Sequence, residues 1–245
     1  MEKRKQLPAY PQAGVASTCR SFDEYCAMFG LDPSSLEGPV LDVAGGASSF
    51  TAALRAKGIS AVAADPFYGG LTEEVIDAGY REIQVSSAKI AAMKDAFDWS
   101  FYGSPERHRS IRERSMALFA DDFRKSEKEE QTVYFPAALP SLPFPDDSFR
   151  LAICSHFLFL YAESFDRDFH VAAIGELLRV LRPGGELRVY PLVNLRWEPY
   201  PHLSDIVKEF EGVATHEFQP SGLPFTPTKS PLLRMVKNGV RSGVG

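Results

Sequence analysis

Short apolar runs alternate with amphipathic stretches along the chain, and this alternation predicts its architecture. Strands are predicted at residues 40–43, 59–64, 151–154 and 186–190. The run at 151–154 is continuously apolar, which is typical of a strand that is buried on both faces. Before the last of these strands, the spacing of Ile174, Leu177, Leu178 and Leu181 predicts a helix with one buried stripe. Strands that alternate with helices predict an α/β protein, with a mostly parallel sheet covered on both faces.

Helix starts are marked by capping residues at two further places. Ser21, with Glu24 at the capping-box position, predicts the start of a short helix. Ser104, followed by Pro105, predicts the start of a second helix that runs to Lys125. Further elements are expected at 50–57 (a helix), 203–211 (a helix) and 232–236 (a closing strand).

The spacing of the elements predicts the domain organisation. Residues 1–38 form an N-terminal arm and helix, and residues 39–245 form the main domain. The stretch from Asp65 to Leu142 is much longer than a minimal connection between two parallel strands. We therefore expect a helical cap to be inserted at about 71–132.

The first strand and the turn after it carry the candidate chemistry. Asp42 lies near the end of this strand, and a run of small residues that includes Gly45 and Gly46 leads into the next helix. Small side chains let a ligand approach the main chain, and the start of a helix offers unpaired N–H groups. Asp65 follows the second strand, where an acid can bind both hydroxyls of a ribose. The sequence therefore predicts a site for a nucleoside-type cofactor.

Composition and charge narrow the possible partners and compartments. The formal net charge is −5 and the pI about 5.6, which argues against nucleic acid as the main partner. Three cysteines without metal-ligand spacing, and no apolar run of membrane length, favour a cytoplasmic protein without disulfides. No motif of paired cysteines, clustered acids or His-Glu-x-x-His type predicts a metal.

Three stretches together resemble the class I S-adenosylmethionine-dependent methyltransferases. They are Val40–Gly46, Leu142–Phe149 and Leu177–Gly185. The resemblance implies a Rossmann-like sheet of seven mostly parallel strands with one antiparallel edge strand. It also implies that the cofactor is S-adenosylmethionine, bound at the carboxyl ends of the first strands.

The resemblance also assigns site residues by position. Asp42, with the loop at Ala44, Gly45 and Gly46, would hold the methionine part of the cofactor. Asp65, which Pro66 follows, would bind the ribose. At the remaining positions, adenine would contact Ala138 and Leu139, whereas the sulfonium and the acceptor would face Cys154, Ser155 and His156.

The chain departs from the family pattern at several of these positions. The family's first motif usually has three alternating glycines, and here these positions are Ala44, Gly46 and Ser48. Alanine fits there if its backbone is not at positive φ. Ala138 replaces an acid that often bonds the adenine amino group, and Arg150 stands where an aspartate is common.

The expected function is methyl transfer from S-adenosylmethionine to a small molecule, an activity of EC 2.1.1 type. His156 is the candidate general base, since imidazole takes up a proton near neutral pH, but it is equally a candidate packing residue. The arginines of 107–114 could attract an anionic substrate or form a solvated helix face. The aromatic residues of 97–102 could line an acceptor pocket or pack the cap. The acceptor atom and the oligomeric state stay open.

Two alternatives of other classes remain at this point. A non-catalytic protein of the same fold would bind the cofactor or a partner without turnover. A nicotinamide-dependent oxidoreductase shares the strand, turn, helix and ribose acid. It is disfavoured because Ala44 to Ser49 lacks the Gly-x-Gly-x-x-Gly spacing and because it does not explain Leu142–Phe149.

Overall fold

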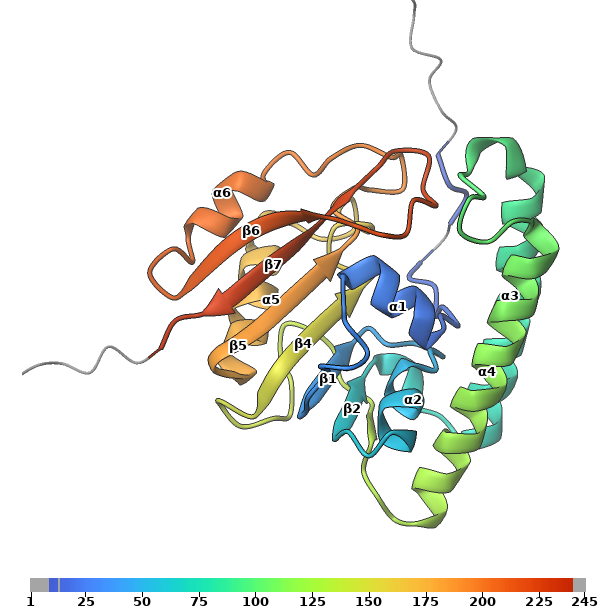
Figure 1. Ribbon diagram of the computed structural model, residues 1–245, viewed down its shortest axis with the longest axis horizontal. Coiled ribbons are helices and arrows are strands. Elements are labelled where there is room, and N and C mark those ends of the chain that lie inside the picture. The colour runs from blue at the N-terminus through green and yellow to red at the C-terminus, as the bar shows by residue number, and fades with distance from the viewer. Residues whose placement is uncertain (1–8, 13, 240–245) are drawn as a thin grey trace, which may run out of the picture.

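A computed structural model describes residues 9–12 and 14–239 of the chain (Figure 1). The helices are α1 (Phe22–Phe29), α2 (Phe50–Ala56), α3 (Thr72–Ala92), α4 (Pro105–Lys128), α5 (Arg167–Val180) and α6 (Leu203–Lys208), with short 3-10 turns η1 (Pro66–Tyr68) and η2 (Lys94–Ala96). The strands are β1 (Val40–Val43), β2 (Ala61–Ala64), β3 (Tyr134–Phe135), β4 (Phe149–Ser155), β5 (Leu181–Tyr190), β6 (Ala214–Pro220) and β7 (Pro231–Lys237). The elements alternate as the sequence predicts.

The strands form one seven-stranded sheet in the order β3-β2-β1-β4-β5-β7-β6. The first five in this order are parallel, and β7 is antiparallel to both β5 and β6. The sheet is therefore mostly parallel, as expected. The antiparallel strand, however, is not at the edge, which corrects that expectation.

Side-chain burial explains why β7 lies inside the sheet and β6 at its edge. Leu232, Leu233 and Met235 of β7 are fully buried, whereas β6 presents mostly exposed or half-buried residues to its surroundings. A polar strand tolerates an edge position, and an apolar one requires neighbours on both sides. The hairpin from β6 therefore returns β7 against β5.

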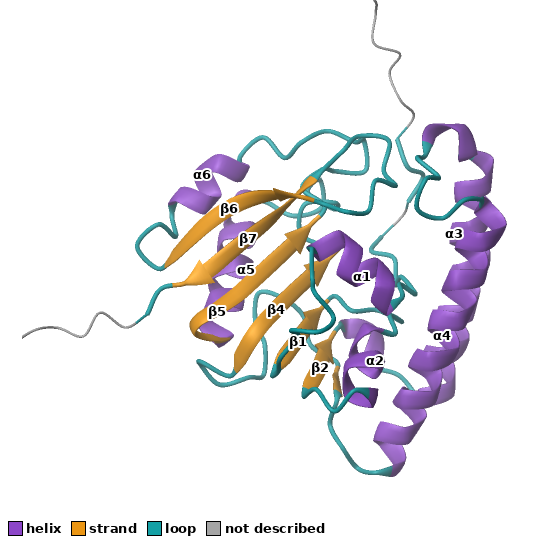
Figure 2. Ribbon diagram, viewed as in Figure 1, coloured by secondary structure: helices purple, strands orange, loops and turns teal. Residues whose placement is uncertain are grey.

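Helices cover both faces of the sheet (Figure 2). One apolar cluster joins Leu41, Val43 and Cys154 of the strands to α5, and a second joins Val40 and Ile153 to α1. The residues of a strand point alternately to the two faces, so both sides of β1 and β4 are buried. None of the described helices has the length and apolar character to cross a lipid bilayer.

The stretch expected to form a helical insertion contains the two long helices α3 and α4. They lie side by side at the flank of the molecule next to α2 (Figure 1). Arg124 of α4 forms an ion pair with Glu73 of α3, with an N–O distance of 2.6 Å. The N-terminal cap of α4 is Ser104 with Pro105 at the first position, as predicted.

Local signals identified most helix starts correctly, but several boundaries differ by a few residues, and the one between α5 and β5 differs most. The Ser21–Glu24 capping box of α1 forms as predicted. Strand β5, however, already begins at Leu181, and Pro183 to Gly185 lie inside it rather than before it. The register between β4 and β5 shifts between Phe149 and Leu151, and a Cβ atom on Gly185 would lie 2.8 Å from the Arg182 carbonyl oxygen.

Candidate functional site

The turn after β1 has the strained geometry of a ligand-binding loop, with an alanine where glycine is favoured. Ala44 has φ of +55° and Gly46 has φ of +53°. The sequence analysis found alanine acceptable here only if its φ were not positive. Ala44 nevertheless has a positive φ. Because a Cβ atom clashes with the backbone there, Ala44 stores strain that glycine would not.

The small residues of this turn are enclosed by the protein's own side chains. A Cβ atom on Gly45 would lie 2.9 Å from the Tyr68 hydroxyl, which donates a hydrogen bond to the Gly46 carbonyl oxygen. A Cβ atom on Gly46 would lie 2.8 Å from Ser17 Oγ and 2.9 Å from the Thr18 nitrogen. Tyr68 and the N-terminal arm therefore both lie directly against the turn.

Asp42 and Asp65 end neighbouring strands on either side of this turn. Asp42 is buried and accepts a hydrogen bond of 3.1 Å from the Tyr25 hydroxyl, and burial raises its pKa well above the usual value. Asp65 accepts one backbone hydrogen bond on each oxygen, from Gly46 (2.9 Å) and from Phe67 (2.8 Å). Since a carboxylate offers about four acceptor positions, Asp65 keeps capacity for two more donors.

Asp65 lies in the wall of a cavity of about 370 Å³, which we call the Asp65 cavity. Five of the residues predicted to bind the cofactor line this cavity: Ala44, Asp65, Pro66, Ala138 and Leu139. Apolar surface from Phe67 and Phe157 completes its walls. Its size and its single carboxylate suit a ligand with a flat apolar part and hydroxyl groups.

The other predicted cofactor residues do not line this cavity. Cys154 is fully buried in the cluster under α5, because it points to the opposite face of β4 from Ser155. The Ser155 hydroxyl lies 3.1 Å from Nδ1 of His156. Asp42 belongs to β1, and Gly45 and Gly46 belong to the turn after it, without lining the cavity.

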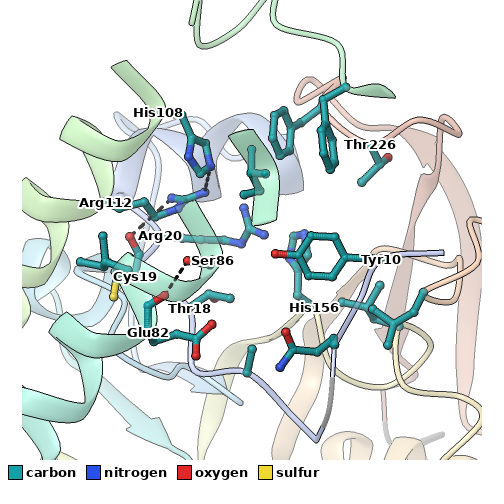
Figure 3. Close-up of a pocket in the computed structure, with 18 of the residues that line it drawn as sticks. Tyr10, Thr18, Cys19, Arg20, Glu82, Ser86, His108, Arg112, His156 and Thr226 are labelled. Atoms are coloured by element: carbon teal, nitrogen blue, oxygen red, sulfur yellow. Dashed lines mark hydrogen bonds between the residues drawn. The ribbon is translucent and has the colours of Figure 1, made fainter. Parts of the chain in front are cut away.

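His156 lines a second cavity, of about 100 Å³, between the N-terminal arm and the helices α3 and α4 (Figure 3). We call it the Arg20 cavity. Burial, together with Arg20 and Arg112, lowers the pKa of His156 well below its usual value, so the imidazole is neutral at pH 7. Within the described residues its Nε2 atom has no hydrogen-bond partner. His156 has φ of +52°, so it ends β4 in a strained conformation.

A buried ion cluster borders the Arg20 cavity. Glu24 accepts hydrogen bonds from the Tyr102 hydroxyl and from Nη1 of Arg112. Burial alone would raise the pKa of Glu24. The positive charges of Arg112 and Arg20 have the opposite and larger combined effect, so the pKa falls to about 2. Burial and Arg112 lower the pKa of the adjacent His108 to about 2. At neutral pH the cluster therefore holds two arginine cations, one carboxylate and a neutral imidazole.

Sequence reasoning found only part of this cluster. Of the arginines at 107–114, Arg112 is buried against Glu24, whereas Arg109 pairs with Glu113 on the exposed helix face. Among the aromatic residues at 97–102, Phe97 lines the cavity and Tyr102 packs in the core. Arg20 gave no signal in the sequence, because it precedes the capping box and its neighbours come from distant segments.

The N-terminal arm separates the two cavities. Val15, Ala16 and Ser17 line the Asp65 cavity, and Ala16 and Thr18 line the Arg20 cavity. The Ala16 amide donates a 2.9 Å hydrogen bond to the Tyr161 hydroxyl, which fixes the arm to the main domain. Ser17 Oγ is buried without a hydrogen-bond partner among the described residues.

Comparisons relate the chain to known proteins. A family model described as a methyltransferase domain matches residues 112–189. The uncharacterized protein MJ0045 of Methanocaldococcus jannaschii is 32% identical over 193 residues, which are 78% of this chain and 84% of that protein.

Two solved structures are similar to the chain at low sequence identity. A putative S-adenosyl-L-methionine-dependent methyltransferase from Methanococcus maripaludis matches with 13% identity and a TM-score of 0.45, covering 90% of this chain and 85% of that one. The N-methyltransferase NodS from Bradyrhizobium japonicum, in complex with S-adenosyl-L-homocysteine, matches with 14% identity and a TM-score of 0.42, covering 84% and 81%.

Proposed function

The chain belongs to the class I S-adenosylmethionine-dependent methyltransferases, and we propose that it methylates a small molecule held in the Arg20 cavity. Its cofactor, S-adenosylmethionine, supplies a methyl group that is already activated on a sulfonium. The protein's own task is to hold donor and acceptor in line and to keep water away.

The Asp65 cavity fits the nucleoside half of this cofactor. Asp65 has two free acceptor positions for the two ribose hydroxyls, and Ala138 and Leu139 offer main chain and apolar surface to adenine. The orphaned hydroxyl of Ser17 supplies a further polar partner at the cavity wall. We assign Asp65, Pro66, Ala138 and Leu139 to the cofactor on this basis.

The methionine half requires the N-terminal arm to move. Ser17 and Thr18 lie within 3 Å of the space above Gly46, where the family places the methionine. The same segment divides the Asp65 cavity from the Arg20 cavity. A shift of the arm would open both the turn after β1 and the path for the methyl group.

His156 is the candidate base in the Arg20 cavity. Its imidazole is neutral at pH 7, and Nε2 is available to accept a proton from a hydroxyl or amine of the acceptor. A lowered pKa makes it a weak base, so it serves an acceptor that loses its proton as the methyl bond forms. A thiolate or a tertiary amine would not need it.

The observation that carries this proposal is Asp65, half saturated by backbone amides at the tip of β2 and open to a cavity of nucleoside size. The test is incubation of the full chain with isotope-labelled S-adenosylmethionine and a small-molecule extract, followed by mass spectrometry. A labelled product that requires active protein is expected. Cofactor binding without any labelled product would support a binding protein instead.

A further inference from the structure

The Arg20 guanidinium is buried at the Arg20 cavity, and two of its nitrogen atoms have no hydrogen-bond partner among the described residues. The residue is 8% exposed, and these two atoms are Nε and Nη1. The nearest carboxylate oxygen, Glu24 Oε1, is 3.7 Å from Nη1. Glu24 already accepts hydrogen bonds from the Ser21 amide and hydroxyl, from Tyr102 and from Arg112. Figure 3 shows the Arg20 side chain reaching into the cavity between Arg112 and His108 on one side and Tyr10 and His156 on the other.

The charges around the cavity leave one positive charge unbalanced. Arg20 and Arg112 share the single carboxylate of Glu24. The other carboxylate at the cavity, Glu82, is half-buried, and burial raises its pKa although the charge of Lys89 opposes this rise. The imidazoles of His108 and His156 are neutral at pH 7. One guanidinium therefore lacks an anion.

An uncompensated buried cation is costly, because both its desolvation and its unmade hydrogen bonds oppose folding. Burial and the neighbouring Arg112 lower the pKa of Arg20 from its usual value, which reflects the same cost. A guanidinium with free donors is the side chain best suited to bind a carboxylate with two hydrogen bonds. A carboxylate on a ligand of this cavity would supply the missing anion.

The other walls define the body of that ligand. They are apolar and largely aromatic, with contributions from Tyr10, Ile90, Phe97, Trp197 and Phe225. The rings of Phe97 and Phe225 are stacked with centroids 4.7 Å apart. The volume of about 100 Å³ is below the roughly 150 Å³ of an apolar cavity that holds benzene. While the arm is in place, the cavity therefore holds a body smaller than one ring, and a body of one ring requires the shift of the arm that the proposed function includes.

We infer that the methyl acceptor is a small monocarboxylate with an apolar body of at most one ring, and that Arg20 binds its carboxylate. This inference rests on the proposed function, which makes the Arg20 cavity the acceptor site. The methionine carboxylate of the cofactor is the other possible source of the anion. It is disfavoured because Asp42, Gly45, Gly46 and Asp65 do not line this cavity.

The experiment uses benzoate as the probe and benzamide, its neutral counterpart of the same shape, as the control ligand. The thermal midpoint of the full chain is measured with each at constant ionic strength, for the wild type, Arg20→Met, Arg20→Lys and Arg109→Met. Arg109 is the matched control, since it lies on the exposed face of α4. Calorimetry with S-adenosylmethionine is run on the same proteins.

Benzoate, but not benzamide, is expected to raise the midpoint of the wild type and of Arg109→Met. Arg20→Met should lose this shift and melt higher than the wild type without ligand, because it removes an unpaired buried charge. Arg20→Lys keeps the positive charge but cannot form a bidentate pair of hydrogen bonds with a carboxylate, so its affinity for benzoate should fall about tenfold.

Three results would overturn the inference. They are equal shifts with benzoate and benzamide, a benzoate shift that survives in Arg20→Met, or a loss of S-adenosylmethionine affinity in Arg20→Met with benzoate binding unchanged. The last result would assign Arg20 to the cofactor. A wild type that binds benzoate through Arg20 but not S-adenosylmethionine would instead refute the proposed function and leave the anion site standing.

Discussion

Some residues of the site could be placed from the sequence, and others could not, because their roles depend on contacts with distant segments or on backbone conformation. Asp65 and Ala138 could be placed from the sequence, because each follows a recognisable strand or motif. Arg20 could not, since the partner of its neighbour Glu24 lies 88 residues further along, at Arg112. A capping box explains Glu24 locally and hides its second role as a buried counter-ion. The strain at Ala44 depends on a φ angle that side-chain chemistry does not reveal.

Ala44→Gly is expected to stabilise the protein by about 0.5–1 kcal/mol, because it removes a Cβ atom from a positive-φ position. Urea unfolding measures the change. Ala53→Gly in the middle of α2 is the matched control and should destabilise by about 1 kcal/mol. Destabilisation by Ala44→Gly as large as that of the control would contradict the claim that Ala44 is strained.

The stability of the protein should fall as the pH decreases from about 6.5. The pKa of His108 is lowered from 6.5 to about 2, first by burial and then by Arg112, so between these values the unfolded chain binds the extra proton. The pKa of His156 is also lowered, and it adds to the loss in the same direction. His108→Gln should reduce the slope between pH 6.5 and 5 by about 1.4 kcal/mol per pH unit.

Urea unfolding at several pH values measures this slope. His216→Gln, at a partly exposed position on the edge strand β6, is the control for the loss of a histidine outside both cavities. An unchanged slope in His108→Gln would mean that His108 is not buried in its neutral form.

At the scale of elements, strong local patterns were predictable and weak or non-local ones were not. Helix α4 was placed by its cap and proline, and β4 by its continuous apolar run. Strand β3 has two residues and β6 is mostly polar, so neither carries a strand pattern. The early start of β5 at Leu181 depends on its register with β4, which only the assembled sheet defines.

The N-terminal arm lines both cavities, so under the proposed function access to them depends on how firmly the arm is held. Tyr161→Phe removes the hydroxyl that accepts the Ala16 amide, so amide hydrogen exchange across residues 14–18 should become faster. Tyr80→Phe, on the exposed side of α3, is the matched control and should not change it. Equal exchange in the two variants would show that the Tyr161 contact does not hold the arm.

At the scale of the whole molecule, the Asp65 cavity was largely predictable from the sequence, and the Arg20 cavity beside it was less so. The βα alternation and the three motifs were sufficient to predict a Rossmann-like sheet, since each is local. Two other features could not be predicted, because they depend on contacts among distant segments. They are the position of β7 between β5 and β6 and the passage of the arm between the two cavities. Under the proposed function, the cofactor binds at the carboxyl ends of β1 and β2, and the acceptor binds between the arm and the helices α3 and α4.

The most direct measurement of this account is calorimetric titration of S-adenosylmethionine into the wild type, Asp65→Asn and Asp166→Asn. Asp166 is a matched control because it caps α5 as Asp65 caps η1, but it lies outside both cavities. The account predicts that the wild type and Asp166→Asn bind S-adenosylmethionine. The affinity of Asp65→Asn should be at least about tenfold lower than that of the wild type, because this variant loses charged acceptors for the ribose. No binding by the wild type, or equal affinity in all three proteins, would contradict it.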